Sequence, residues 1–484
     1  MNETILTWVI FILAFGGMVL IHEFGHFIAA RLSKVEVEEF GIGLPTPGAL
    51  TLWINKGYLL LKNGKRIEIP YNFGLPITWN ELIENEVKIT VDQVNDRLVL
   101  RSIEASQLED PLRYATSRQL DHVYMDQNGK VVESPEDAVQ AASRKIIKAG
   151  KKTGEIELVD VVTEVHPGTR FTLNWLPLGG FVRPKGENDP NVPGGLAAAS
   201  PWKRLFVLFA GPVMNLLTAV LIYSIIFNQV GIPDPTRVSV SSVSEDGPAA
   251  QAGFQAGDIF ISGNEKPIAS IEQLREIVNA NENKPVVFLV DRNGEQIELT
   301  TTPQFTRLED GTERVMIGVG LGSPFKAPES PMETLSLGAQ FTWQNIRMLI
   351  ALPAQMIRGS LNSEESRLIG LKGIFDVLQQ TVSRDVEAAS TPAATTSTNP
   401  IDRPIMTLNL IASLSVSLGL FNLFPFPALD GGRIIFVLPE LIFRKRVPPQ
   451  FENMVHAAGM AFLLLLMIYI NVMDFINPVN VTIP

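Results

Sequence analysis

The sequence predicts a polytopic α-helical membrane protein with two soluble insertions. Three observations predict it: apolar residues make up 46% of the 484 and gather in a few long segments, β-type segments lie between these, and an H-E-x-x-H motif ends the first apolar segment. We therefore expect about four transmembrane helices, a cytoplasmic α+β insertion, and an extracytoplasmic β-rich domain.

The composition excludes some partners and limits the residue types that could bind a metal. The net charge is -11 and no basic stripe occurs along the chain, which argues against nucleic acid as a partner. The chain has no cysteine, so a metal must be bound by histidine and carboxylate, and only five histidines are available. The N-terminus, MNETILTW, has no positively charged region, so we expect the first apolar segment to stay in the membrane rather than to be removed as a signal peptide.

The first apolar segment, roughly 5–30, ends with the motif HEFGH at 22–26. On a helix, His22 and His26 share a face and can bind one zinc ion, while Glu23 can reach the attacking water. The alternative is a pair of helix histidines that packing satisfies. It is disfavoured, because two histidines and a glutamate are costly inside hydrocarbon and usually mark a functional site.

Three further apolar segments are expected to span the membrane. Segment 205–227 follows Lys203 and Arg204, and its Gly-Pro pair is tolerated if a neighbouring helix satisfies the freed backbone groups. Segment 406–424 is rich in serine and small residues, as expected of a helix packed inside a bundle. Segment 456–473 is strongly apolar, and we expect a plain anchor.

The basic residues predict the orientation. Many Lys and Arg lie in 31–204, and the short connection 433–455 holds Arg433, Arg444, Lys445 and Arg446, whereas residues 1–4 and 474–484 have none. Basic loops remain in the cytoplasm. We expect a multi-pass protein of the inner or plasma membrane with both termini and the β-rich domain outside, and with the metal motif toward the cytoplasmic side.

The regions between the apolar segments have distinct patterns. In 48–165, RIEIP, EVKITV and RLVLRSI predict strands, and PEDAVQAASRKIIKAG predicts an amphipathic helix. In 234–305, short β-type runs surround a helical SIEQLREIVNA, which predicts a small folded domain. We expect an interfacial amphipathic helix at 338–358 and a flexible surface loop at 389–400.

A catalytic zinc site needs a third protein ligand. Asp430 is the best candidate, since it follows the third apolar segment in NLFPFPALDGGRIIF (422–436), where a charged carboxylate needs a strong partner. Pro425 and Pro427 would break the helix, and the two glycines after Asp430 would let the backbone approach the metal. The alternative is an ordinary D-G-G turn. Of the other histidines, His122, His166 and His456, we expect none to be a ligand and interpret His166 as a loop histidine.

The chain resembles the site-2 protease family, bacterial intramembrane zinc metalloproteases that cut anti-sigma factors and remnant signal peptides. The resemblance rests on HEFGH (22–26), NWLPLGGFVRP (174–184), WKRLFVLFAGPVMN (202–215) and NLFPFPALDGG (422–432), in the family's order. It implies that His22, His26 and Asp430 bind Zn²⁺, that Glu23 is the catalytic glutamate, and that Asn422 contacts the substrate backbone. The implied substrates are single-span transmembrane proteins, which must unwind locally before cleavage.

The resemblance also concerns two β-rich parts. GPAAQAGFQAGDIFISGNEKPI (247–268) resembles a PDZ stretch, which implies binding of peptide C-termini or extended segments by strand addition. VEVEEFGIGLP (35–45) resembles the family's membrane re-entrant β-segment, which could hold an unwound substrate. The long insertion and Arg433, in place of a frequent histidine, depart from the family's pattern.

The sequence predicts seven regions along the chain. The expected domains are a first transmembrane helix with a re-entrant segment (1–47), a soluble insertion (48–165), the PLGG segment and second helix (166–230), a PDZ-like domain (234–305), a linker (306–404), the third helix with LDGG (405–436) and the fourth helix (437–484). Two other functions remain open. The first is a catalytically inactive PDZ-bearing scaffold, which would bind partners without turnover. A metal-ion transporter is disfavoured, because it gives no role to Glu23 or to a PDZ-like domain.

Overall fold

The computed structural model describes residues 3–74, 79–94, 97–105, 124–125, 131–132, 155–244, 247–307, 313–358, 367–390 and 404–478. The chain divides into two compact units, Phe15–Gly211 with Ile434–Asn453, and Met1–Ala14 with Pro212–Arg433 and Met454–Pro484. Each unit is described by itself. The amphipathic helix expected in 135–150 lies outside the described residues, and so does the loop expected at 389–400 apart from its first two residues.

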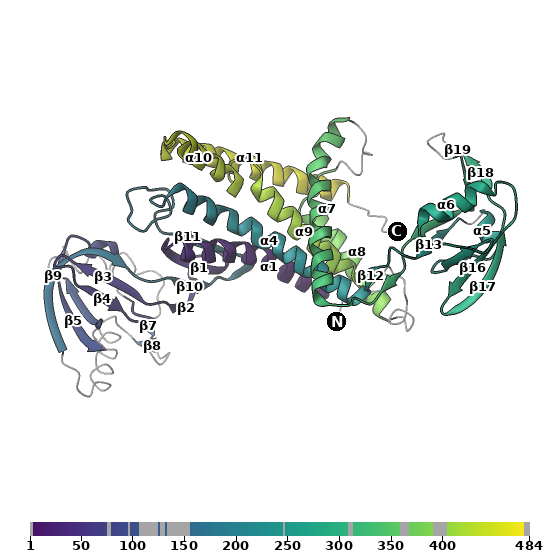
Figure 1. Ribbon diagram of the computed structural model, residues 1–484. Helices are drawn as coiled ribbons and strands as arrows, with labels where there is room; N and C mark the ends of the chain where they lie inside the picture. Colours follow the sequence, from purple (N-terminus) through teal and green to yellow (C-terminus); the bar gives the residue numbers. More distant parts are fainter. Residues whose placement is uncertain are drawn as a thin grey trace. The chain divides into compact units, whose positions relative to one another are not determined.

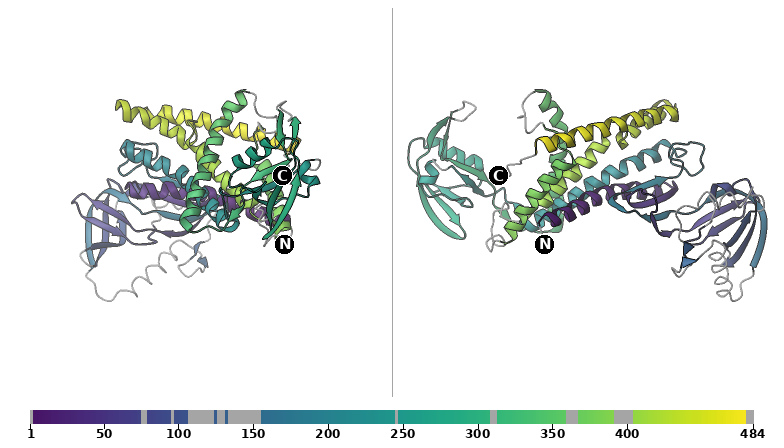
Figure 2. Two further views of the ribbon diagram at one scale, coloured as in Figure 1. Left: turned by 45° about the vertical axis from the view of Figure 1, so that its right-hand side comes forward. Right: turned by 180° about the vertical axis from the view of Figure 1, so that it is seen from behind.

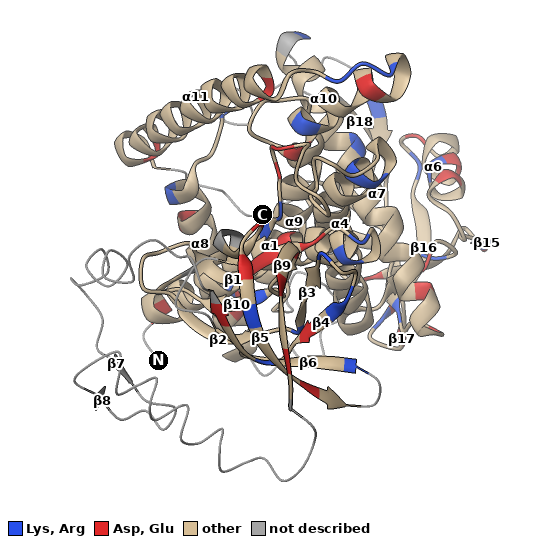
Figure 3. Cartoon of the chain, turned by 90° about the vertical axis from the view of Figure 1, so that its left-hand side faces the viewer, with Lys and Arg blue, Asp and Glu red and all other residues tan. Residues whose placement is uncertain are grey.

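Four helices of the described chain are long and apolar enough to cross a membrane: α1 (Glu3–Leu32), α4 (Pro201–Val230), α9 (Met406–Leu423) and α11 (Pro449–Ile476). They contain the four apolar segments expected from the sequence. Figure 3 shows α11 free of Lys, Arg, Asp and Glu along most of its length. Such helices cannot expose a polar face to water, so their apolar surfaces are expected to face lipid or each other. The protein is therefore a membrane protein.

The first unit contains a four-stranded sheet in the order β11-β1-β10-β2. Strand β1 (Val37–Leu44) runs parallel to β10 (Arg170–Leu173) and antiparallel to β11 (Leu176–Pro184), and β2 (Leu50–Ile54) forms one edge. Strand β1 comprises most of the 35–45 segment singled out in the sequence. Strand β11, at the other edge, lies against α1, since a Cβ on Gly179 would meet the Val19 side chain at 2.7 Å.

Apart from β2, which belongs to the four-stranded sheet, most of the described part of the 48–165 insertion is a closed β-barrel (Figure 1). Its strands follow the order β3 (Gly57–Leu61), β4 (Arg66–Ile69), β6 (Arg97–Ala105), β5 (Glu86–Val94) and β9 (Glu155–His166). A short 3₁₀ turn (Trp79–Leu82) accompanies it, and β7 (Tyr124–Met125) and β8 (Val131–Val132) form a separate two-stranded sheet. The strands expected for the α+β insertion are present, and its expected helix lies outside the described residues. Alternating side chains such as Leu59 and Ile67 fill the core.

Two adjacent chain segments join the barrel to the sheet, and we call them the neck: residues 55–57 and 166–168. A Cβ on Gly57 would lie 2.1 Å from the His166 carbonyl oxygen, and a Cβ on Gly168 would lie 2.1 Å from the Asn55 carbonyl oxygen. The Asn55 amide donates to the Thr169 carbonyl at 2.9 Å. Only glycine permits the two segments to pass so closely. The neck therefore connects the barrel firmly to the sheet.

The second unit contains a separate β domain, residues 238–322. Its sheet has the order β17 (Glu295–Thr301), β16 (Val286–Arg292), β14 (Ile259–Gly263), β13 (Val238–Val243) and β20 (Val319–Gly322), with β15 (Lys266–Pro267) paired to β14. Two short helices, α5 (Pro248–Gln251) and α6 (Ile271–Ala280), and the hairpin of β18 (Gln304–Arg307) with β19 (Glu313–Met316) accompany it. The strands and the helix expected within 234–305 are present, and β20 extends the sheet past residue 305. At the base, β12 (Ile232–Pro233) pairs with β21 (Phe325–Lys326).

The helices that follow this domain pack within the same unit. Helix α7 (Pro331–Arg358) includes the segment expected at 338–358 and runs across α4 and α9 (Figures 1 and 2). Its Phe341 ring lies 5.2 Å from Tyr223 and 5.6 Å from Phe227 of α4. Helix α8 (Leu371–Ser390) follows. Helix α9 has a buried face that includes Ser415 and Gly419, as expected of a helix packed inside a bundle.

Helix α11 is more than the plain anchor expected from its apolar sequence. Near its C-terminal end, the fully buried Asp474 accepts hydrogen bonds from the Gly370 amide at 2.8 Å and from Arg367 at 2.8 Å. A buried carboxylate needs such partners. Near its start, His456 Nδ1 accepts a hydrogen bond from the Ala428 amide at 2.9 Å. Both ends of the helix therefore hold other parts of the chain in place.

Candidate active site

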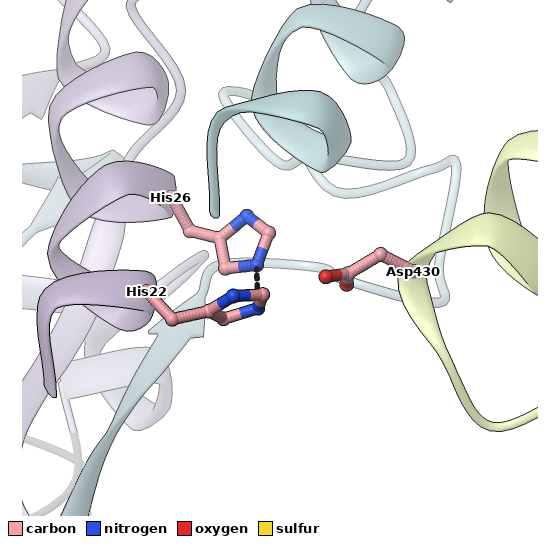
Figure 4. A group of neighbouring side chains, drawn as sticks. All are labelled: His22, His26 and Asp430. Carbon is pink, nitrogen blue, oxygen red and sulfur yellow. Dashed lines mark hydrogen bonds between the residues drawn. The ribbon is translucent and has the colours of Figure 1, made fainter. Parts of the chain in front are cut away.

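The two histidines of the HEFGH motif lie buried on one face of α1, with 6% of His22 and 9% of His26 exposed. Their Nε2 atoms are 3.2 Å apart (Figure 4). The Nδ1 atom of His26 donates to the Val207 carbonyl at 2.8 Å. A neutral imidazole that donates from Nδ1 carries its lone pair on Nε2, which is the form that binds a metal. The backbone of α4 therefore selects the ligating tautomer of His26.

A glycine of α4 makes room beside the two imidazoles. A Cβ on Gly211 would lie 2.4 Å from His26 Nε2 and 2.8 Å from His22 Nε2. Real Cβ atoms essentially never approach other atoms so closely, so any larger residue would push the rings aside. Both nitrogens that would bind a metal thus face the one position on α4 that has no side chain.

Glu23 is held by the edge strand of the sheet. The Val182 amide of β11 donates to Glu23 Oε2 at 3.1 Å. Strand β11 can reach α1 because of Gly179 and Gly180, whose Cβ positions would collide with Val19 and Leu20. The hydrogen bond keeps the Glu23 carboxylate oriented beside the histidine pair.

The third expected ligand, Asp430, is the first residue of α10 (Asp430–Phe443). Helix α9 ends at Leu423, ahead of Pro425 and Pro427 as expected. Among the described residues, His22, His26 and Asp430 form a group whose potential ligand atoms all lie within 4.8 Å of one another (Figure 4). A helix N-terminus is a favourable position for a carboxylate.

The role expected for the glycines after Asp430 needs correction. A Cβ on Gly431 would lie 2.1 Å from the Phe424 carbonyl oxygen, and one on Gly432 would lie 2.3 Å from the Phe426 carbonyl oxygen. The two glycines therefore let α10 begin against the preceding loop, and the close approach is to protein backbone. Both have negative φ, so the left-handed conformation is found instead at Ala428, with φ 77°.

The remaining residues singled out in the sequence lie elsewhere. Asn422 is in the last turn of α9 and is partly buried. His166 is the last residue of β9, not a loop histidine, and it is buried in an ion pair with Glu36. The loop interpretation fails because the strand continues through T-E-V-H until Pro167 ends it. His122 lies outside the described residues.

Four contributors to the site are not recognisable from their residue type. Val207 and Val182 act through backbone atoms, which leave no side-chain signal. His456 supports the loop before Asp430 from a helix that looks like an ordinary anchor. Gly211 lies in the WKRLFVLFAGPVMN motif, so the sequence did mark it as a residue of interest. The motif does not indicate that Gly211 contacts the histidines.

The comparisons with known proteins agree with this arrangement. A model of peptidase family M50 matches residues 10–59 and 156–466, which is most of the chain. The chain belongs to peptidase family M50. This confirms the resemblance to the site-2 proteases. The match omits 60–155, which contains most of the barrel, so the barrel is an addition to the family's common core.

Two of three curated relatives of this M50 chain are similar over nearly its full length, and the third over about three fifths. Zinc metalloprotease RasP of Oceanobacillus iheyensis is 27% identical over 479 residues, covering 96% of this chain and 97% of the relative. The probable protease eep of Enterococcus faecalis is 26% identical over 476 residues, covering 97% of each. Metalloprotease MmpA of Caulobacter vibrioides is 29% identical over 333 residues, covering 62% of this chain and 81% of the relative.

A solved structure matches one part of the M50 chain. The PDZ domain of an SdrC-like protein from Listeria monocytogenes covers 19% of this chain and 90% of that domain, at 19% identity and a TM-score of 0.16. A TM-score this low carries no argument about the fold.

Proposed function

We propose that this protein is a zinc-dependent endopeptidase that hydrolyses peptide bonds of transmembrane substrates within the membrane. The observation that carries the proposal is the buried His22–His26 pair, with Nε2 atoms 3.2 Å apart and with Gly211 leaving space beside both. Membership of peptidase family M50 and the names of the relatives support it.

The donor set fits zinc. Two imidazole nitrogens and one carboxylate, from His22, His26 and Asp430, are a known type of catalytic zinc environment that leaves a position for water. The Val207 carbonyl accepts a hydrogen bond from His26 Nδ1, and histidines that bind a metal usually make such a bond through their other ring nitrogen. A zinc ion held there supplies Lewis acidity, which polarises the scissile carbonyl and makes water nucleophilic near neutral pH.

Glu23 performs the proton transfers in this proposal. Its carboxylate takes a proton from the attacking water and later delivers it to the leaving amine. The Val182 amide stabilises the carboxylate in one orientation, which positions the base for the proton transfer. Water has to reach this point, so the site is expected to open toward the cytoplasm.

The substrate is proposed to bind as an extended strand. A helical substrate hides its carbonyls in its own hydrogen bonds, so a single-span protein must unwind before attack. Strand β11, an edge of its sheet, carries Val182 next to Glu23, and an added strand there would lie beside the catalytic group. Asn422 is proposed to bind the substrate backbone near the scissile bond.

The β domain of the second unit is proposed to bind peptide in the manner of a PDZ domain. A cavity of about 650 Å³ lies between α6 and the segment of β19 and β20, lined by apolar residues such as Leu274, Val278 and Ile317 together with Arg275. Edge strand β20 offers free main-chain pairing beside it. We propose that the domain and both termini are extracytoplasmic, as the basic loops predict.

Replacement of Glu23 tests the proposal. We expect Glu23→Gln to retain zinc, measured by mass spectrometry of the metal, while cleavage falls by about 10²–10⁴-fold or more, because general acid–base catalysis is lost. Membrane proteomes of cells with the wild-type and Glu23→Gln proteins are compared for transmembrane fragments that accumulate. Glu3→Gln, the same change at the other glutamate of α1, is the matched control and should cleave normally.

The same experiment decides between this function and an inactive scaffold. A scaffold requires that Glu23→Gln and wild-type cells accumulate the same fragments, and that peptide binding to the β domain occurs without turnover. Cleavage at the wild-type rate by Glu23→Gln would contradict the proposed mechanism, whatever the zinc content.

A further inference from the structure

A charged cavity of about 540 Å³ lies where the barrel meets the four-stranded sheet, within the first unit. We call it the neck pocket. Its basic and imidazole side chains are Arg31, Lys56, Arg170, Arg183, Lys185 and His166. Five Lys and Arg side chains and three Glu side chains line the pocket. This excess of basic residues stands out in a chain whose net charge is -11. Neither the proposed catalytic site nor the peptide groove uses these residues. Figure 3 views this side of the molecule, where charged segments of both signs occur around β1, β10 and β9.

The first of the three glutamates is neutralised by the pocket itself. Glu39 is buried, with 6% of its side chain exposed, and accepts hydrogen bonds from Arg170 at 2.9 Å and from Arg183 at 3.1 Å. Its other oxygen accepts from Thr172 at 2.9 Å. Both carboxylate oxygens are therefore in use, and Glu39 holds the two guanidinium groups side by side.

The second glutamate is similarly occupied. Glu36 pairs with His166 Nδ1 and accepts from Lys185 Nζ at 3.2 Å. Burial raises the pKa of Glu36, but the hydrogen bond from His166 and the charge of Lys185 outweigh burial and leave the pKa lowered. The third glutamate, Glu38, has a raised pKa, chiefly because of desolvation.

Arg170 and Arg183 have more N–H groups than their hydrogen bonds to Glu39 use. Arg170 and Arg183 reach Glu39 through one nitrogen each, while 49% and 51% of their side chains are exposed. A guanidinium has five N–H donors in a planar fork, which suits the oxygens of a phosphate. Lys56 is paired with Glu68, and Arg31 also lines the cavity, so the positive charge that remains comes chiefly from Arg31, Arg170 and Arg183.

The position of the pocket indicates where the phosphate comes from. Arg31 lies in the last turn of α1, a helix that is apolar over most of its length. Strand β2 leads into the pocket at Ile54 and exposes Leu52 and Trp53 at 41% and 44%. Tryptophan and arginine beside the end of a membrane helix are typical of the headgroup level of a bilayer.

We propose that the neck pocket binds the phosphate headgroup of an anionic membrane lipid. Arg170 and Arg183 bind the phosphate oxygens through their outward N–H groups, and Arg31 supplies further positive charge. The bound headgroup stabilises the barrel at a fixed depth relative to the membrane. It also lies beside Lys185, which directly follows the strand whose Val182 amide orients Glu23.

The test uses the full-length protein with Glu23→Gln, so that it does not depend on proteolysis. Native mass spectrometry counts lipids bound to the protein in detergent, with phosphatidic acid or zwitterionic phosphatidylcholine added, and with inorganic phosphate as competitor. We expect one phosphatidic acid to bind at least about tenfold more tightly than phosphatidylcholine, because a hydrogen bond to a charged group is worth about that factor or more.

Variants locate the binding. Arg31→Gln combined with Arg183→Lys should weaken phosphatidic acid binding by at least about tenfold, since charge is lost at one position and the guanidinium fork at the other. Arg183→Lys keeps a positive charge beside Glu39, and an unchanged thermal midpoint shows that the fold persists. Lys88→Gln, on the barrel surface away from the pocket and paired with Glu157, is the control and should bind as before.

Three results overturn the proposal. Equal binding of both lipids, or equal loss of binding in the pocket variant and in Lys88→Gln, shows only non-specific attraction. Binding of inorganic phosphate without any preference for phosphatidic acid shows a site for a soluble phosphate instead of a lipid.

Discussion

Two buried histidine environments lie in the same unit, and they differ in what the ring nitrogens face. On α1, the Nε2 atoms of His22 and His26 face each other at 3.2 Å, and a backbone carbonyl binds the remaining nitrogen of His26. At the neck, His166 faces carboxylates through both nitrogens, Glu36 through Nδ1 and Glu164 through Nε2 at 3.3 Å. Its ring also stacks on Tyr58 at a centroid distance of 4.1 Å.

We propose that the difference separates a metal site from a structural cluster. Both ring nitrogens of His166 have carboxylate partners within the chain, so no metal is needed to satisfy them. Two imidazole nitrogens converge on α1, and Asp430, within 4.8 Å of them, completes a donor set of the right size for a zinc ion. The number of histidines is therefore less informative than the groups around each ring.

The largest effect that would test this comparison is on zinc content. We expect His26→Ala to lose stoichiometric zinc, with an affinity loss beyond the roughly 10–100-fold typical of an outer-shell partner. His166→Ala should keep one zinc per chain. Metal analysis of both purified variants, after dialysis against a weak chelator, makes the measurement. A zinc loss in His166→Ala equal to that in His26→Ala would contradict the distinction between the two environments.

A second, smaller effect concerns the space beside the imidazoles. Gly211→Ala places a Cβ at 2.4 Å from His26 Nε2, so the ring must shift, and zinc affinity should fall by about 10–100-fold, as when an outer-shell partner is lost. Gly17→Ala on α1 is the matched control, because nothing lies within 4 Å of its Cβ position. Competition with a coloured chelator measures both affinities. If the two variants bind zinc equally well, Gly211 does not shape the site.

These residues also show how far the sequence could predict the site. His22, Glu23 and His26 lie within one turn of a helix, so their spacing alone indicates shared chemistry. Asp430 was predictable because an acid after an apolar segment is costly without a partner. The Val207 carbonyl, 181 residues from His26, acts through the backbone and leaves no trace in residue type.

The fold was predictable to a similar extent. Long apolar segments identify the four candidate spans, because length and hydropathy are local properties. Alternation of apolar residues identified strands such as β5 and β16, but not that β3 and β9 close a barrel. Closure depends on pairing between strands far apart in the chain. The neck pocket combines residues from both ends of that insertion, so no local pattern could indicate it.

The smallest effect concerns the ion pair at the neck and its dependence on pH. The pKa of Glu36 is lowered, since His166 and Lys185 together outweigh the effect of burial. An acid whose pKa is lower in the folded state stabilises that state above its unfolded pKa of about 4.5, and this contribution disappears as pH falls through the folded value. Glu36→Gln should therefore lower the free energy of unfolding by about 1–3 kcal/mol at pH 7, and by less below pH 4.5.

Glu38→Gln is the control, because the pKa of Glu38 is shifted in the opposite direction to that of Glu36. Desolvation raises its pKa above 4.5, so its ionisation opposes folding as pH rises through that range. Glu38→Gln should leave stability at pH 7 unchanged or slightly higher. Thermal unfolding of the full-length protein in detergent, followed by tryptophan fluorescence between pH 4 and 8, compares the two variants. If Glu36→Gln and Glu38→Gln shift the midpoint in the same direction and with the same pH dependence, His166 does not form a charged pair with Glu36. The neck would then have to be stabilised mainly by the close backbone packing at Gly57 and Gly168.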